Sequence, residues 1–188
     1  NRKFSMEKSS LRGINREGLN PSLYERVNEL KTKIYAAYGS NMNIEQMAIR
    51  CPKAKVIGTG ILKDYKLTFR GLGRGGVANV EQSKGSSVPI VLWEITSECE
   101  VALDRYEGYP SLYTKRVVEV TCKDKSKVKA MGYVMAKRYE SYPSEPCEAY
   151  YHVIVDGYKA NGLSTQKLSE ALISTRDEIY IKQNALEK

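Results

Sequence analysis

The sequence predicts an α+β fold, in which a mostly antiparallel, curved or barrel-like sheet has helices packed against it. Three observations point to it. Seven strand-like runs follow one another from residue 33 onward, the connections between several of them are short, and helical periodicity is confined to a few segments. Short connections favour antiparallel neighbours, because a parallel crossover needs a dozen or more residues. The helices are therefore expected to pack against a curved sheet rather than to alternate with its strands.

The expected strands are rich in β-branched and aromatic residues, which suit a pleated and half-buried surface. In chain order they are KIYAAY, KVIGTGIL, YKLTF, GVANVE, VPIVLWEI, YTKRVVEVTC and VKAMGYVMA. Two short segments, LKD (62–64) and EQSKGSS (81–87), are expected to connect neighbouring strands.

Three helices are expected in this domain, at 44–50, about 97–107 and about 165–185. Apolar side chains recur at helical spacing in the first, at Ile44, Met47, Ala48 and Cys51. The last carries such a face at Leu168, Leu172, Thr175 and Ile179. Recurrence at intervals of three and four residues places these side chains on one side of a helix.

Two regions are expected along the chain. Residues 1–32 are predicted to be an N-terminal extension with a short helix, because Ser22 and Glu25 have the spacing of a capping box. Residues 33–188 form the main domain, which includes the C-terminal helix at 165–185.

Composition limits the function. The 188 residues include one histidine, His152, and four widely spaced cysteines, so neither a multi-histidine metal centre nor a zinc site is indicated. No run approaches the roughly 18 apolar residues of a membrane span. A reducing cytoplasm is the expected setting. The net charge of +8 is scattered, as in KDKSKVK (123–129), which favours a solvated basic surface over nucleic-acid binding.

The segment GLGRGG (71–76) fits the G-x-G-x-x-G pattern of dinucleotide-binding proteins. That fingerprint requires a strand before the glycines and a helix after them. Here another strand-like run follows, so we expect a hairpin or loop beside a pocket and no cofactor.

A second glycine segment, Tyr38-Gly39-Ser40-Asn41, lies between an expected strand and an expected helix. Asn43 with Gln46 predicts the cap of that helix. Free N–H groups at a helix start favour an anion. A tight strand-to-helix turn and a carboxylate site explain these residues equally well.

The segment SECEVALDRYEGYP (97–110) predicts a helix with a capping box at Ser97 and Glu100 and a stop at Gly108. Cys99, Ala102 and Tyr106 are expected on its buried side, with Leu103 near the edge and Asp104 pointing away. Glu107 is expected at the border of that side, in the last turn, where partial burial and the helix dipole raise its pKa. A raised pKa suits a general base, although a surface glutamate at a helix end explains the residue too.

Four segments together resemble the γ-glutamylcyclotransferase-like family, over roughly residues 33–165. They are YAAYGSNMN, RCPKAKVIGTGILKDYKLTF, LDRYEGYPSLYTKRVVEV and YYHVIVDGYKANGL, in that order. The resemblance implies the small mixed barrel of that family and release of 5-oxoproline from γ-glutamyl compounds. It also implies that Glu107 is the catalytic residue.

By the same resemblance, Tyr38, Gly39, Ser40 and Asn41 hold the γ-glutamyl group, and Tyr113 and Tyr150 line the pocket. The α-amine of the substrate would attack its own γ-carbonyl, with Glu107 moving the proton and no cofactor involved. Well-oriented intramolecular attack reaches effective molarities of about 10⁵–10⁸ M. The partner is thus a small γ-glutamyl molecule.

Two alternatives remain open from the sequence. One is an enzyme of the same fold that is selective for γ-glutamyl amines or removes a γ-glutamyl protecting group in a biosynthesis, differing only in the leaving group. The other is a non-catalytic module that binds a γ-glutamyl compound or an amino acid. The leaving group and the oligomeric state are not readable from the residues.

Overall fold

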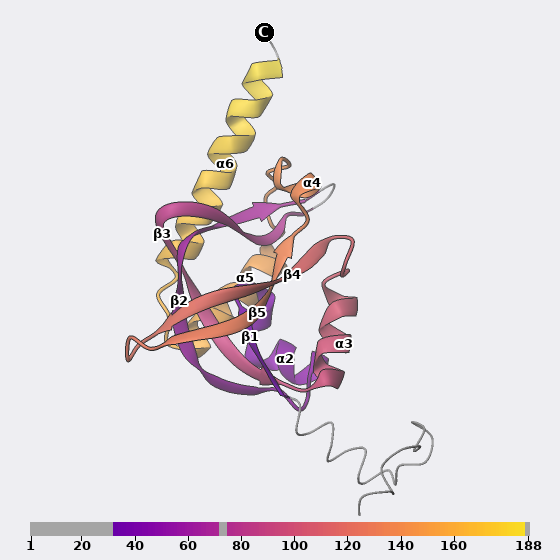
Figure 1. Ribbon diagram of the computed structural model, residues 1–188. Coiled ribbons are helices and arrows are strands. Elements are labelled where there is room, and N and C mark those ends of the chain that lie inside the picture. The colour runs from indigo at the N-terminus through magenta and orange to yellow at the C-terminus, as the bar shows by residue number, and fades with distance from the viewer. Residues whose placement is uncertain (1–31, 72–74, 187–188) are drawn as a thin grey trace, which may run out of the picture.

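The computed structural model describes residues 32–71 and 75–186, and a closed five-stranded barrel lies at its centre (Figure 1). The barrel strands are β1 (Lys33–Ala37), β2 (Lys55–Arg70), β3 (Val77–Ile95), β4 (Tyr113–Cys122) and β5 (Lys127–Met135). The remaining elements are η1 (Ser40–Met42), α2 (Ile44–Arg50), α3 (Ser97–Tyr106), α4 (Lys137–Glu140), α5 (Glu148–Ala160) and α6 (Gln166–Leu186).

The barrel is mixed, as the resemblance to the γ-glutamylcyclotransferase-like family implies. The strands are ordered β1-β3-β2-β4-β5, and every neighbouring pair is antiparallel except β1 and β5, which pair in parallel at Tyr35 and Met131. This parallel contact closes the sheet. Closure removes the exposed strand edges that an open sheet would present.

The long β2–β3 hairpin corrects two predicted connections. LKD and EQSKGSS lie inside β2 and β3 and do not separate shorter strands. The register slips where Asp64, with a φ of 60°, faces the longer β3 segment, and its carboxylate accepts a hydrogen bond from Gly85 N–H at 2.9 Å. An irregularity of this kind bends a strand without ending it. The polar residues of these segments were therefore interpreted as turns, although they form an irregular part of the paired strands.

The helices predicted at 44–50, about 97–107 and about 165–185 are present as α2, α3 and α6, and α4 and α5 were missed. Helix α5 contains many aromatic and β-branched residues, which have modest helix propensity. It packs where Gly157 passes the backbone of Met42 and Asn43: a Cβ at position 157 would lie 2.7 Å from Asn43 N. Tertiary packing, which a short window of sequence does not contain, stabilises this helix.

Helix α3 departs from its prediction in two details. Its N-cap is Thr96, whose hydroxyl accepts a hydrogen bond from Cys99 N–H at 3.2 Å, and not Ser97. Leu103 is fully buried, whereas Tyr106 remains 45% exposed. The buried stripe is thus rotated toward Leu103, which turns the end of the helix toward the barrel and leaves Tyr106 at its rim.

The predicted apolar face of α2 is narrower than expected. Met47 and Cys51 are buried, but Ile44 is 45% exposed and Ala48 is exposed as well. The predicted cap is correct, since the Asn43 side chain accepts a hydrogen bond from Gln46 N–H at 3.0 Å. Met47 and the C-cap residue Cys51 thus form the buried side of this short helix, which contacts η1 and α3.

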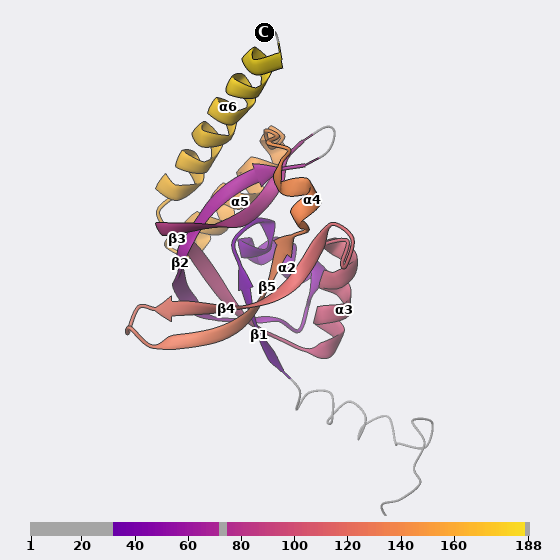
Figure 2. The same ribbon diagram turned by 45° about the horizontal axis from the view of Figure 1, so that its top comes forward.

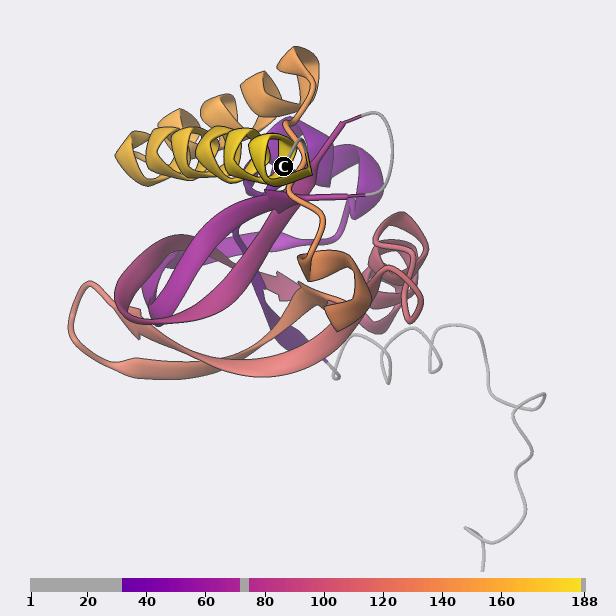
Figure 3. The same cartoon turned by 90° about the horizontal axis from the view of Figure 1, so that it is seen from above.

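Helix α6 lies along β2 on one side of the barrel, and α3 lies on another side (Figures 2 and 3). Leu168 and Thr175 on the predicted face are buried. The Thr175 hydroxyl accepts a hydrogen bond from Phe69 N–H at 3.3 Å, so the helix supplies a partner for the strand backbone. In the described part of the chain, no helix is long and apolar enough to cross a membrane. The short helix expected within residues 1–32 lies outside the described residues.

Arg70, which is 2% exposed, joins the barrel to α6. Its Nε lies 2.6 Å from Glu81 Oε1 on β3, and its Nη1 lies 2.9 Å from Glu178 Oε2 on α6. Removing one partner of a buried ion pair leaves the other charge uncompensated, which is more costly than losing an exposed pair.

We expect Arg70→Met to lower the free energy of unfolding by about 3 kcal/mol, because two carboxylates lose their shared cation. The matched control is Arg176→Met, whose exposed partner is Glu145 at 2.9 Å; it should change the stability by less than about 1 kcal/mol. Urea unfolding of both variants measures the difference. Equal effects would contradict a special role for Arg70.

Candidate functional site

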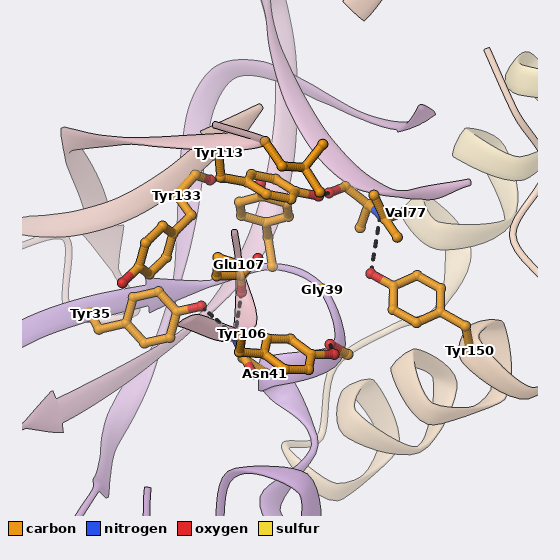
Figure 4. A pocket seen from close by; sticks show the side chains of 13 residues that line it. Tyr35, Gly39, Asn41, Val77, Tyr106, Glu107, Tyr113, Tyr133 and Tyr150 are labelled. Carbon is orange, nitrogen blue, oxygen red and sulfur yellow. Dashed lines mark hydrogen bonds between the residues drawn. The ribbon is translucent and has the colours of Figure 1, made fainter. Parts of the chain in front are cut away.

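A cavity of about 210 Å³ opens at the barrel wall, where β1, β3, β4, β5, α3 and α5 meet. Glu107 lies at its centre, with aromatic rings around it (Figure 4). The lining residues are Tyr35, Tyr38, Gly39, Ser40, Asn41, Val77, Ala78, Tyr106, Glu107, Leu112, Tyr113, Tyr133 and Tyr150. All seven residues that the sequence assigned to the site are among them. Two of them, Tyr38 and Tyr150, are 112 positions apart in the sequence and meet in this cavity.

The turn after β1 forms the floor of the cavity. Its residues Ser40–Met42 make a single 3-10 turn, closed by a hydrogen bond from Met42 N–H to Gly39 O at 2.9 Å, before α2 begins. A Cβ at Gly39 would lie 3.1 Å from Ala78 Cβ, so only glycine lets the backbone approach β3 without a shift. The first N–H groups of a helical turn have no partner within it. They are therefore available to a ligand.

Glu107 is the C-cap of α3, and Gly108 follows it with a φ of 62°. This left-handed residue ends the helix and turns the chain away, so the Glu107 side chain extends into the cavity. Its Oε1 accepts a hydrogen bond from Asn41 Nδ2 at 2.7 Å. Burial raises the pKa of Glu107 to about 7, against the opposing effects of the Arg50 charge and the Asn41 hydrogen bond. The carboxyl group can thus gain or lose a proton near neutral pH.

Three of the tyrosine hydroxyl groups around Glu107 are held by backbone atoms. Tyr38 donates to Tyr133 O at 2.7 Å, and Tyr113 donates to Ala78 O at 2.6 Å. Tyr150 accepts from Ala78 N–H at 3.2 Å. Burial raises the pKa of Tyr38 and Tyr113 well above the usual value, so these rings stay neutral. They form a rigid wall around one titratable carboxyl group.

Sequence reasoning missed Arg50, which contacts the site through Asn41. It also missed six residues of the cavity lining, which are Tyr35, Val77, Ala78, Tyr106, Leu112 and Tyr133. The composition holds a partial signal, because the chain has fourteen tyrosines and two phenylalanines, but tyrosine also suits half-exposed strands. Nothing in a single sequence selects which of the tyrosines converge.

The structure also tests the glycine segment at 71–76. It connects β2 to β3, which pair antiparallel, so no helix follows the glycines as a dinucleotide fingerprint requires. In residues 32–71 and 75–186, no three His, Cys, Asp or Glu side chains gather into a possible metal site.

Fold and site together define a class of protein: a small closed barrel whose wall pocket holds one carboxyl group, tuned near neutral pH, beside a glycine-containing turn. The comparisons specify that class further. The model of the family described as "Gamma-glutamyl cyclotransferase, AIG2-like" matches residues 35–152. The chain belongs to this family.

Individual relatives agree. A mouse (Mus musculus) protein named Gamma-glutamylcyclotransferase is 34% identical over 160 residues, which are 81% of this chain and 83% of the relative. A human (Homo sapiens) protein of the same name is 34% identical over 138 residues, 69% of this chain and 72% of the relative. A solved structure described as "Gamma-glutamyl cyclotransferase" is 30% identical, with a TM-score of 0.68, over 75% of this chain and 86% of that one.

The raised pKa of Glu107 has a consequence for stability. Between pH 4.5 and 7 the folded protein keeps a proton on Glu107 that the unfolded chain has already lost. Stability contributed by this group is therefore highest below pH 4.5 and is lost as the pH rises to about 7.

We compare the free energy of unfolding of Glu107→Gln with that of wild type at two pH values. The difference, variant minus wild type, should be higher at pH 8 than at pH 4.5 by about 1–3 kcal/mol, since glutamine does not ionise. Thermal or urea unfolding at both pH values measures this difference. The control Glu148→Gln, at a side chain 91% exposed, should show none. A pH-independent difference for Glu107→Gln would contradict the raised pKa.

Proposed function

We propose that this protein is a γ-glutamylcyclotransferase, which releases 5-oxoproline from a γ-glutamyl amino acid or a γ-glutamyl amine. The observation that carries the proposal is that Glu107, with a pKa of about 7, and the Gly39–Asn41 turn line the same cavity. Membership of the family and the names of the relatives support the same reaction. They do not favour the non-catalytic binding module, which would have no need of a carboxyl group tuned in this way.

The reaction joins two parts of one substrate. The α-nitrogen forms a bond to the γ-carbonyl carbon, the bond from that carbon to the leaving nitrogen breaks, and the five-membered lactam of 5-oxoproline remains. The α-ammonium loses two protons over the reaction, and both end on the leaving amine, so charge is conserved. No enzyme nucleophile is needed, because a well-oriented amine within the substrate has a high effective concentration.

Glu107 is proposed to be the group that moves these protons. A substrate α-amine with a reference pKa of roughly 7.7–8.0 is mostly protonated at neutral pH and must lose a proton before it attacks. A carboxylate with a pKa of about 7 can accept that proton and return it to the leaving nitrogen. Acid–base catalysis of this kind contributes typically about 10²–10⁴-fold to the rate.

The turn at Gly39, Ser40 and Asn41 is proposed to hold the substrate α-carboxylate through its free N–H groups. The Arg50 guanidinium, 2.7 Å from Asn41 Oδ1, adds positive charge behind the turn. The rings of Tyr38, Tyr113 and Tyr150 would keep the bent substrate in place and exclude water. Each of these groups is fixed before the substrate arrives, which is the condition for an effective electrostatic contribution.

Other predictions from the sequence stay predictions: the domain boundary at residue 33, a cytoplasmic setting, and the absence of a nucleic-acid partner. The substrate is a small γ-glutamyl molecule in either version of the proposal. The two versions, amino acid or amine, differ only in the group that leaves.

We expect wild type to release 5-oxoproline from at least one member of a panel of γ-glutamyl dipeptides and γ-glutamyl amines. Glu107→Gln should reduce kcat by at least about 100-fold, because the amide cannot accept the proton. Chromatographic detection of 5-oxoproline measures both, and the panel identifies the leaving group. Glu148→Gln, far more exposed, serves as the control and should retain wild-type rates.

Equal turnover by wild type and Glu107→Gln would remove Glu107 from the reaction. Turnover of no substrate in the panel by a folded wild type would favour the binding module instead. Calorimetric titration with the same panel would then test ligand binding directly.

We expect a bell-shaped pH profile for kcat/KM. The acidic limb should bend near pH 7, where Glu107 loses its proton and becomes a base. The alkaline limb should bend near the pKa of the substrate amine, roughly 8, above which no proton remains to transfer. Initial rates between pH 5 and 10 measure both limbs. A profile that is flat between pH 5 and 8 would contradict a base with this pKa.

A further inference from the structure

Arg50, a residue outside the cavity lining, contacts both the turn and the rim of the site. It is the last residue of α2 and is partly buried. Its Nη1 donates to Asn41 Oδ1 at 2.7 Å, and its Nη2 donates to Gln46 Oε1 at 2.7 Å. Its guanidinium lies over the Tyr106 ring, 3.7 Å from the ring centroid. One side chain therefore contacts η1, α2 and α3 at once.

The chemistry of arginine decides how the Asn41 amide is oriented. A guanidinium group has donors and no acceptor, so the atom of Asn41 that faces it must be the carbonyl oxygen. The amide nitrogen must then point the other way. There it donates to Glu107 Oε1 at 2.7 Å and to the Tyr35 hydroxyl at 2.9 Å. With the amide reversed, its NH₂ group would face the Arg50 donors and its oxygen would face the Glu107 carboxylate. Both contacts would then be unfavourable.

Arg50 is itself fixed in place. Gln46 lies one turn earlier on the same helix and holds the second guanidinium nitrogen. The Tyr106 ring holds the flat face of the group, and the Tyr106 hydroxyl lies 3.1 Å from Ser40 Oγ. A planar group with several donors can satisfy these partners together, which the ammonium of lysine cannot. A basic residue here also suits the C-terminal end of α2, but that role alone would be served by lysine equally well.

We propose that Arg50 is a positioning residue: it locks the Asn41 amide so that the Asn41 nitrogen donates to the Glu107 carboxylate and holds it in the cavity. The inference rests on the proposed function, because it assigns Arg50 a role in the acid–base step of that reaction. Arg50 touches neither the substrate nor the reacting atoms in this scheme, and acts through Asn41.

The groups that face Glu107 support this role. Around it lie Tyr35 from β1, Tyr113 from β4, Tyr133 from β5, Tyr106 from α3 and Tyr150 from α5. Burial raises the pKa of four of these hydroxyl groups: Tyr35, Tyr113, Tyr133 and Tyr150. These four carry no charge near neutral pH. Arg50 and the Asn41 hydrogen bond both lower the pKa of Glu107, in opposition to its burial.

The first test does not depend on catalysis. Protein labelled with ¹³C at the glutamate side-chain carboxyl carbons reports the titration of Glu107 by NMR, and Glu107→Gln identifies the resonance. We expect the midpoint of Arg50→Met to lie above that of wild type, because the charge and the fixed Asn41 donor are both lost. Arg105→Met is the control: it removes an exposed cation two residues from Glu107, and its midpoint should equal that of wild type.

The second test uses the reaction. Arg50→Met should lower kcat/KM at pH 7 by about 10–100-fold, and its acidic limb should move up with the NMR midpoint. Arg50→Lys should recover part of the loss, since its ammonium can still donate to Asn41 Oδ1 but cannot hold Gln46 and lie on Tyr106 as well. Thermal unfolding of each variant shows whether the fold is intact.

The outcomes separate the two proposals. An unchanged Glu107 midpoint in folded Arg50→Met would overturn the role of Arg50, whether or not the protein is an enzyme. A raised midpoint without 5-oxoproline release by wild type would support the positioning role and overturn the proposed reaction. If Arg50→Met lost activity while the acidic limb of its kcat/KM profile stayed at the wild-type pH, the positioning role would be wrong. Arg50 would then have only a structural role in α2.

Discussion

The hydrogen bond between Asn41 and Glu107 is the interaction on which the site depends. It joins the turn after β1 to the end of α3, two segments 66 residues apart in the sequence. On one side, Asn41 is 2% exposed and is held by Tyr35 and Arg50. On the other, Gly108 ends α3 so that the carboxyl group extends inward. The partly buried carboxylate of Glu107 benefits from such a donor, because removing a charged group from water without a hydrogen-bond partner is costly.

The barrel supplies the rigidity that this interaction needs. The closed sheet places β1, β3, β4 and β5 around the cavity, and its strands carry Tyr35, Tyr113 and Tyr133. The tyrosine hydroxyl groups have partners in the backbone, as Tyr113 has in Ala78 O at 2.6 Å, or in side chains, as Tyr133 has in Asp104 Oδ1 at 2.6 Å. The walls are thus fixed and neutral, and Glu107 is the group in the lining whose pKa is brought close to neutrality.

Most of the fold could be predicted, and the errors have identifiable causes. The strands, a curved or barrel-like sheet and three helices follow from periodicity and turn residues, and the family resemblance adds the small mixed barrel. LKD and EQSKGSS were predicted to connect strands, but they form an irregular part of the β2–β3 hairpin. The prediction was wrong because Asp, Gly and Ser favour bulges and turns alike. Helix α5 was missed since its stability comes from the fit of Gly157 against η1, a contact between distant segments. The N-cap of α3 was misplaced by one residue, from Thr96 to Ser97.

The sequence by itself determined the chemistry that is available: a glycine turn after a strand, a glutamate at a helix end before glycine, and many tyrosines. It did so because caps, turns and residue types are local properties. The tertiary structure alone decided which of these groups meet. It placed Glu107 against Asn41, rotated α3 so that Tyr106 lies at the rim, and brought Arg50 to the Asn41 oxygen. Burial, and with it the pKa of Glu107, is a property of that assembly and not of any one segment.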